Sequence, residues 1–249
     1  MYGLSKDVVK VVVDELQLMR GRGVKVGDFL IKPLTMGEIE ELTESKYFQY
    51  ISILTIGKES FQITDDNIPL FDLVFAICTR EEDFRYLFLN SMSCFIREEI
   101  KMYANSIGFF FYSENEEVCS FITKDNYDDI IEVIKYQNCL IKKSENDENP
   151  ANEKAREILE KQKKARALLA KAKGSGDGES LTLADLVSIL ASNGNGITPF
   201  NVWDMNFYWF NNQFNRMKML DEYDINIRSL LAGAKSEDID LKHWMGKIK

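Results

Sequence analysis

The sequence predicts a mainly α-helical protein with two small β-hairpins, in which an α+β N-terminal domain precedes an all-α C-terminal unit. Three observations lead to this prediction. Apolar residues recur every three or four positions in several segments, which is typical of amphipathic helices. Two pairs of short apolar stretches flank turn residues, which is typical of hairpins. Polar and glycine-rich segments separate the two halves of the chain.

The N-terminal domain is expected to begin with a helix and a hairpin. Residues 4–20 place their apolar side chains at helical spacing, although a run of β-branched residues opposes this helix. Gly21 and Gly23 are expected to end it, because glycine is unfavourable inside a helix and readily adopts other backbone conformations. Residues 24–31 contain two short apolar stretches separated at Gly27, which predicts the first hairpin.

Three further helices are expected before the second hairpin. Thr35 and Glu38 are three residues apart, which predicts a capping box at the start of a helix. Apolar side chains at helical spacing extend this helix through Leu54. Residues 70–78 and 84–103 have the pattern of two more helices.

The second hairpin is expected from two aromatic or β-branched stretches. Residues 109–112 and 118–122 flank the polar sequence Ser-Glu-Asn-Glu-Glu, which is typical of a hairpin loop. Thr123 or Asp125 then caps a helix that runs to about Leu140. The N-terminal domain is therefore expected to be mostly helical.

Changes in composition divide the chain into five parts. Residues 1–149 carry 16 basic and 27 acidic side chains, whereas residues 150–249 carry 15 basic and 13 acidic side chains. The expected parts are an N-terminal domain (1–143), a polar linker (144–151), a connector helix (152–173), a glycine-rich linker (174–180) and a helical C-terminal unit (181–249).

The connector helix has an unusual charge pattern. Its apolar side chains are alanine, leucine and isoleucine at helical spacing, and residues 161–173 hold six basic and no acidic side chains. Basic residues near a helix C-terminus favour its dipole, which explains part of this pattern. Three interpretations remain open: a solvated surface helix, a helix that binds a partner protein, and a contact to nucleic acid.

The C-terminal unit is expected to consist of helices, one of them rich in aromatic residues. Thr182 is a plausible cap for a short helix over 181–190. Thr198-Pro199 has the pattern of a second helix start. The helix that follows carries an aromatic seam, with Trp209 beside it, whose members recur at steps of three and four: Phe200, Trp203, Phe207, Phe210 and Phe214.

Two interpretations of the aromatic seam are open. A unit of roughly 70 residues needs large side chains to bury enough apolar area, so the seam is expected to form its core. Alternatively, part of the seam stays exposed and binds a partner through Trp203, Phe207, Phe210, Phe214 and Trp209, because aromatic residues are enriched at interfaces. Single-stranded nucleic acid also stacks on aromatic rings, but this helix lacks a basic groove.

The composition excludes several classes of function. The formal net charge of −9 does not favour nucleic acid or an anionic membrane as the main partner. His243 is the only histidine, and the four cysteines contain no closely spaced pair, so a metal site is not expected. No apolar run is long enough to span a membrane. Cys78, Cys94 and Cys139 lie among apolar or helix-forming residues, as buried free thiols usually do.

Motifs for catalysis or cofactor binding are also missing from the sequence. Its acidic pairs are adjacent residues, which point about 100° apart on a helix and so are poor partners for paired-carboxylate chemistry. Neither glycine-rich stretch has the pattern of a phosphate-binding loop. We therefore expect no enzymatic activity, no cofactor and no metal.

The C-terminal half resembles a family of phage proteins. The sequences "NPANEKAREILEK", "ADLVSIL", "FNVWDMNFYWFNNQFNRM" and "DLKHWMGKI", over about residues 149–249, are similar to tail assembly chaperones of tailed phages and prophages of Gram-positive bacteria. The N-terminal sequence "IKPLTMGEIEEL" is compatible with the same group.

The resemblance implies a non-enzymatic role in the host cell cytoplasm. Such chaperones bind the tape measure protein, keep it soluble and assist the polymerisation of tail-tube protein around it, and self-association is also possible. One alternative is a structural tail or baseplate component that stays in the virion. Another is a small enzyme or nucleic-acid factor whose site the sequence does not reveal.

Overall fold

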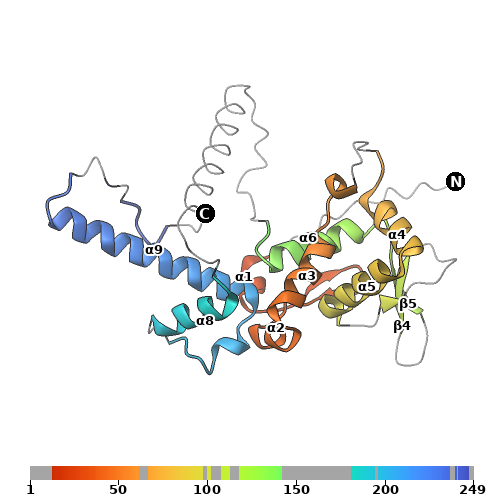
Figure 1. Cartoon of the computed structure of the whole chain (residues 1–249), viewed down its shortest axis with the longest axis horizontal. Helices are drawn as coiled ribbons and strands as arrows, with labels where there is room; N and C mark the ends of the chain where they lie inside the picture. Colours follow the sequence, from red (N-terminus) through yellow and green to blue (C-terminus); the bar gives the residue numbers. More distant parts are fainter. Residues whose placement is uncertain are drawn as a thin grey trace.

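The computed structural model describes residues 13–61, 67–97, 100–101, 108–112, 118–141, 181–193, 196–235, 239 and 241–246. The predicted linkers and the connector helix, residues 144–180, lie outside the described residues. Within them, the expected fold class is confirmed, since helices dominate and two small antiparallel sheets accompany them (Figure 1).

The first described elements are a short helix and the first hairpin. Helix α1 (Glu15–Met19) begins after Asp14, which caps it, so the described part is shorter than predicted. Strands β1 (Val24–Val26) and β2 (Phe29–Ile31) pair antiparallel around Gly27, whose φ is +59°. Both strands bury their first and third side chains and expose the middle one, so one face of the hairpin lies on the core.

The predicted helix after Thr35 is two helices, α2 (Met36–Leu42) and α3 (Glu44–Leu54). The capping box of Thr35 and Glu38 is confirmed. The prediction of one continuous helix is wrong because Thr43 takes a φ of +75°, which breaks the helix. The Thr43 hydroxyl then accepts a hydrogen bond from the backbone of Lys46 and caps α3.

The next helices also end at specific residues. Helix α4 (Leu70–Arg80) confirms the prediction over 70–78, and a 3₁₀ helix, η1 (Lys58–Phe61), precedes it. Helix α5 (Glu82–Ile96) is shorter than the predicted helix over 84–103. Arg97 ends it in a left-handed conformation, with φ of +67°.

The second sheet has three strands instead of the two predicted. Strands β4 (Phe109–Tyr112) and β5 (Val118–Ile122) form the predicted hairpin, and β3 (Ile100–Lys101) pairs with β4. A helical pattern continues through Ile100, which is why β3 was expected to be helical. Gly108 precedes β4, and a Cβ atom there would collide with the backbone carbonyl of Ile122.

Helix α6 (Tyr127–Gln137) follows the second sheet and differs from its prediction at both ends. Asn126 occupies the cap position in place of Thr123 or Asp125, and its side-chain oxygen accepts a hydrogen bond from the Thr123 backbone. The helix ends before Leu140 because Cys139 has a φ of +57°.

Two helices and one 3₁₀ helix make up the described C-terminal unit. Helix α8 (Leu183–Ser192) begins with a capping box between Thr182 and Asp185, as the sequence predicts for the cap. The predicted helix start at Thr198-Pro199 is wrong. Only the short 3₁₀ helix η2 (Val202–Asp204) follows it, and α9 (Phe207–Leu231) begins after Asn206.

One hydrophobic core unites elements from both halves of the chain. It contains buried side chains of the first hairpin, of α2 to α6, and of α8, η2 and α9. Aromatic rings pack together in this core: the centroid of the Phe109 ring lies 5.0 Å from that of Phe88 and 5.9 Å from that of Phe71. Two hydrogen bonds inside the core come from polar side chains: the Tyr47 hydroxyl donates to Asn138 Oδ1 (2.7 Å), and Gln137 Nε2 donates to the Ile31 carbonyl (2.9 Å).

Backbone hydrogen bonds join the described parts of the two halves at one place, which we call the Thr35–Asn206 bridge. The Met36 amide donates to the Met205 carbonyl (2.8 Å), and the Phe207 amide donates to the Leu34 carbonyl (3.1 Å). Figure 1 shows the start of α9 beside α1 and α2 at this junction. The division into separate domains stays a prediction, but the described parts of both share this contact.

Asn206 has two tasks at the bridge. Its side-chain oxygen accepts a hydrogen bond from the Trp209 amide (3.0 Å) and caps α9. Its side-chain nitrogen donates to the carbonyl of Met19 (3.1 Å), the last residue of α1. The residue is only 6% exposed. Its loss therefore leaves buried backbone groups without partners, which is costly.

We predict that Asn206→Ala lowers the free energy of unfolding by about 2 kcal/mol, because it removes a helix cap and a buried hydrogen bond. Urea unfolding followed by circular dichroism measures this. Asn211→Ala, in the interior of the same helix, is the control and is expected to change stability by less than about 0.5 kcal/mol. Equal effects of the two variants would contradict the role of Asn206.

A partly buried ion pair links α2 to the end of α5. Arg97 Nη2 lies 2.7 Å from the carboxylate of Glu38, which also accepts from the Thr35 backbone (2.8 Å). Burial raises the pKa of Glu38, but the hydrogen bonds from Arg97 and Thr35 and the charge of Arg97 outweigh it, so the pKa is lowered overall. The ionised carboxylate thus stabilises the fold.

We predict that Glu38→Gln lowers stability near pH 7 by about 0.5 to 1 kcal/mol, a figure already reduced for solvent screening. Because the folded pKa is lowered, the ionised group stabilises the fold above its unfolded pKa, and this stabilisation disappears as the pH falls through the folded value. The difference between wild type and variant should therefore vanish below about pH 4. Urea midpoints from pH 3 to 7 test this.

Glu82→Gln serves as the control for this pH series. Its carboxylate is 88% exposed and lies 3.8 Å from Arg85, so its removal should change stability very little at any pH. A Glu38→Gln effect that is the same at pH 3.5 and pH 7 would show that the charge of Glu38 does not contribute.

Candidate partner-binding surface

The described residues contain no cluster of three or more histidine, cysteine, aspartate or glutamate side chains that could hold a metal ion. Burial raises the pKa of the Cys78 thiol to about 12, and burial also raises that of Cys94. Both therefore stay protonated near neutral pH and are poor nucleophiles. Among the helices that the structure describes, none is long and apolar enough to cross a membrane.

His243 is placed by packing. Its ring lies 5.1 Å from that of Tyr223 and 6.0 Å from that of Trp244, and its Nδ1 accepts from the Met245 backbone (3.2 Å). The two residues that follow it, Trp244 and Met245, form a turn. Through these contacts the His243 ring packs the tail against α9 and accepts a backbone hydrogen bond.

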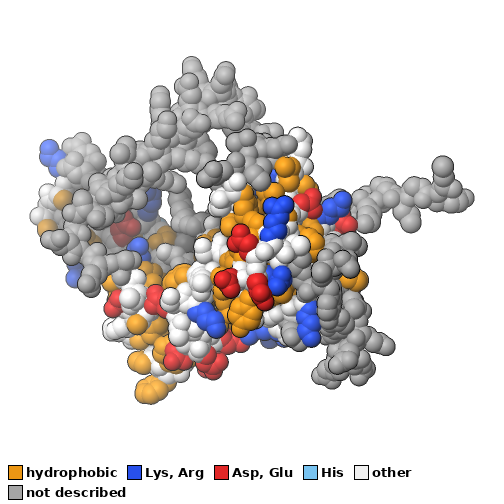
Figure 2. Space-filling model, turned by 45° about the vertical axis from the view of Figure 1, so that its right-hand side comes forward, with side chains coloured by type: hydrophobic (Ala, Val, Ile, Leu, Met, Phe, Trp, Pro, Cys, Tyr) orange, Lys and Arg blue, Asp and Glu red, His pale blue; other side chains and the backbone are white. Residues whose placement is uncertain are grey.

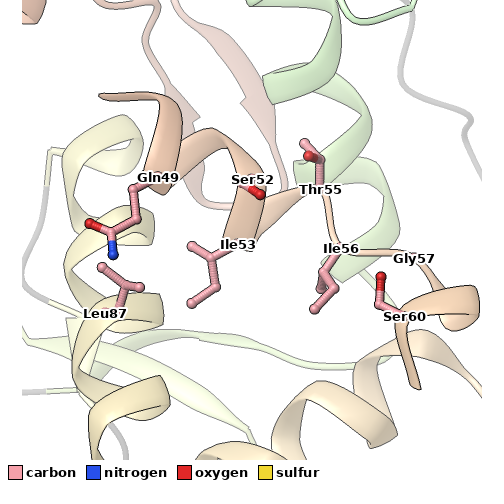
Figure 3. A pocket seen from close by; sticks show the side chains of 8 residues that line it. All are labelled: Gln49, Ser52, Ile53, Thr55, Ile56, Gly57, Ser60 and Leu87. Atoms are coloured by element: carbon pink, nitrogen blue, oxygen red, sulfur yellow. The ribbon is translucent and has the colours of Figure 1, made fainter. Parts of the chain in front are cut away.

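A pocket of about 520 Å³ lies between α3, η1 and α5 (Figure 3). Its lining combines aliphatic side chains with hydroxyl and amide groups, and none of the eight lining residues carries an acid, a base or a thiol. Gln49 and Leu87 lie at one end and Ser60 at the other. The Thr55 hydroxyl already donates to the Ile51 carbonyl (2.8 Å). This lining offers hydrogen bonds but no pair of groups for acid–base or nucleophilic catalysis.

The aromatic seam expected on one helix is split in the structure. Phe200 and Trp203 precede α9, so the prediction that all five residues share one helical face is wrong. The cause is the Thr35–Asn206 bridge, which holds Met205 in an extended conformation and starts the helix at Phe207. The spacing of three and four residues between Phe200, Trp203 and Phe207 therefore does not reflect a helical repeat.

Phe207, Phe210 and Phe214 lie on the side of α9 that packs on the core. Phe210 is 2% exposed. The Phe207 ring is partly buried, 5.5 Å from Tyr47 of α3. Phe214 is also partly buried, and the ammonium group of Lys218 lies 5.9 Å from its ring. These three residues therefore support the fold, as one of the two interpretations of the seam expects.

The three remaining residues of the set predicted to bind a partner, Phe200, Trp203 and Trp209, are exposed. We call these three residues the aromatic surface. Phe200 is 90% exposed, and each tryptophan is 38% exposed. The indole N–H of Trp203 donates to the Pro199 carbonyl (2.7 Å), which fixes its orientation. Figure 2 shows that hydrophobic side chains are exposed in groups among charged ones on one face of the molecule.

The aromatic surface stands on a backbone that is held from both sides. A Cβ atom at Gly37 would lie 3.3 Å from the Trp203 carbonyl oxygen, so the start of α2 closely approaches η2. On the other side, the Asn206 cap fixes the first turn of α9, which contains Trp209. Aromatic side chains on a rigid backbone lose little entropy when a partner binds them.

Sequence reasoning missed the length of α9. The helix has 25 residues, continues without a break to Leu231 and projects past α8 (Figure 1). A described tail, 241–246, contacts it where Arg216 donates to the carbonyls of Trp244 (2.8 Å) and Gly246 (2.6 Å). Apolar residues at helical spacing from Leu220 onward were the signal that could have revealed the longer helix.

Comparison with known proteins locates a likeness in the C-terminal part of the chain. Residues 171–249 match the family model described as YomV second domain. No curated protein and no solved structure matches the chain. The matched segment includes α8, η2, α9 and the whole aromatic surface. The match suggests a phage-type protein, similar to YomV of a Bacillus prophage.

Proposed function

We propose that this protein is a non-enzymatic tail assembly chaperone of a phage, which acts in the host cytoplasm. Its partner is the tape measure protein, which it binds and keeps soluble while tail-tube protein polymerises around it. The observation that carries the proposal is the aromatic surface, formed by three exposed aromatic side chains on a rigid backbone. The phage-type likeness of the same segment supports it.

The chemistry of the partner follows from this surface. A tape measure protein is mostly long amphipathic helix, which aggregates when its apolar stripe is exposed to water. Large aromatic side chains can cover such a stripe, and tryptophan is among the residues that contribute most to binding energy. The excess of acidic residues in 1–149 favours solubility of the complex.

The surface is suited to reversible binding. Three aromatic side chains provide a few strong contacts but a small area, so the partner can be released when the tail tube encloses it.

We predict that Phe200→Ala with Trp209→Ala weakens binding of the tape measure protein at least about 30-fold, as expected for the loss of one strong interface residue. The tagged full chain is co-expressed with the tape measure protein, and the captured protein is quantified by mass spectrometry. Phe200 is 90% exposed, so Phe200→Ala alone should unfold at the same urea concentration as wild type, whereas Trp209 is 38% exposed, so circular dichroism must show that the double variant is folded.

The matched control is Phe48→Ala with Tyr86→Ala. These residues are 46% and 72% exposed and lie on α3 and α5, outside the aromatic surface. This variant should capture the partner like wild type. A folded Phe200/Trp209 variant that still captures the partner at the wild-type level would refute the proposed surface. Stoichiometric presence of the protein in purified virions would instead identify a structural tail or baseplate component.

A further inference from the structure

The outer half of α9 carries a second apolar stripe. Leu220, Tyr223, Ile227 and Leu230 follow one another at steps of three, four and three, which places them on one side of the helix. We call these four residues the arm stripe. Each is only partly buried, and the neighbouring Leu231 is 84% exposed. An amphipathic helix normally packs such a stripe against another element.

The described tail contacts the inner end of this region. The Tyr223 ring lies 5.1 Å from that of His243, and Arg216 binds two backbone carbonyls of the tail. These contacts lie between Arg216 and Tyr223. Ile227 and Leu230 lie one and two turns farther out, where Figure 1 shows α9 projecting past α8.

Acidic side chains accompany the arm stripe. Asp221, Glu222 and Asp224 are all exposed, and Arg228 is the only basic residue between positions 219 and 231. Arg228 pairs with Asp224 at 2.6 Å, one turn away. This part of α9 therefore combines an apolar stripe with a net negative charge, a surface that favours a basic amphipathic helix.

The chain itself contains a segment with the complementary pattern. Residues 161–173 carry six basic and no acidic side chains. Their apolar positions, Ala165, Leu168, Leu169 and Ala172, are three or four residues apart and share one side of a helix. The alanines allow a close approach to the larger side chains of the arm stripe.

The tether between the two segments is long enough for contact. Nine residues, 174–182, separate Lys173 from the first residue of α8, and they can span up to roughly 30 Å. Helix α8 packs against α9, whose residues from 218 to 231 extend over roughly 20 Å. A connection of this length raises the effective concentration of the attached segment to the millimolar range.

We propose that residues 161–173 dock as a helix along the arm stripe of the same chain, with their lysine and arginine side chains beside Asp221, Glu222 and Asp224. The inference goes beyond the proposed function and does not depend on it, because it concerns a contact within one chain. It also uses a different surface, since the arm stripe shares no residue with the aromatic surface.

Limited trypsin digestion of the full chain tests the docking. Trypsin cleaves after lysine and arginine, so docking should slow cleavage within 161–173. Neutralising the arm with Asp221→Asn, Glu222→Gln and Asp224→Asn should speed this cleavage at least about 10-fold, and Ile227→Ser with Leu230→Ser should do the same. Raising the salt concentration to 0.5 M should speed cleavage of the wild type as well.

The control is Glu40→Gln with Glu41→Gln, an exposed acidic pair on α2, which should leave cleavage within about 2-fold of wild type. Equal cleavage rates in wild type and both arm variants would overturn the proposal. If an arm variant unfolds, as circular dichroism would show, carbodiimide cross-linking of the wild type decides instead. Cross-links from the lysines of 161–173 to Asp221, Glu222 or Asp224 are expected, and their absence would overturn the proposal.

The same cross-linking separates this chain from a second copy. Wild-type protein labelled with ¹⁵N is mixed with unlabelled protein before the reaction. Docking within one chain gives cross-links between peptides of equal labelling. Mixed cross-links would show that a second copy occupies the arm stripe, which would overturn the proposal in this form.

Discussion

The two backbone hydrogen bonds of the Thr35–Asn206 bridge are the interaction on which the other features depend. They fix Met205 in an extended conformation and thereby determine where α9 begins. The start of α9 in turn directs Phe207 and Phe210 towards the core and leaves Phe200, Trp203 and Trp209 at the surface. A shift of this start by one residue would rotate every side chain of the helix by about 100°. The bridge thus determines which aromatic residues a partner can reach.

The side chains around the bridge reinforce it because each satisfies a backbone group at a helix end. Thr35 and Glu38 cap α2 on one side, and Asn206 caps α9 on the other. Glu44 adds a third contact by accepting a hydrogen bond from the Leu183 amide at the start of α8 (3.1 Å). Each of these side chains therefore accepts a hydrogen bond from an amide group at a helix N-terminus: Thr35 at α2, Asn206 at α9 and Glu44 at α8.

Elements that depend on neighbouring residues could be predicted from the sequence. The capping residues Thr35 and Thr182 and the hairpin turn at Gly27 are of this kind, since all the groups involved lie within a few residues. The breaks at Thr43 and Arg97 could not, because neither residue type is typical of a positive φ. The Arg97 side chain also pairs with Glu38, a residue far away in the sequence, and such a contact has no local sequence pattern.

The candidate site was predictable only in part for the same reason. The aromatic residues could be recognised as the dominant feature of the C-terminal unit, and two interpretations, core and interface, were open. In the structure some of these residues fit the first interpretation and others the second: Phe210 lies in the core, while Trp203 and Trp209 are exposed. The predicted helix start at Thr198 failed because the true start depends on a strand-like contact with Thr35, a residue far away in the sequence.

The distance along the chain between Thr35 and Asn206 has a consequence for synthesis in the cell. The ribosome adds 170 residues between Thr35 and Asn206, which takes roughly 10 to 30 s at common rates of translation. During this time the capping box of Thr35 and Glu38 can already form, because it needs only local groups. The first hairpin and the seven-residue helix α2 are nevertheless too short to be stable on their own in water, so their packing depends on segments that are made later. Any pause in translation lengthens the time during which the core side chains that α9 will cover are exposed to solvent.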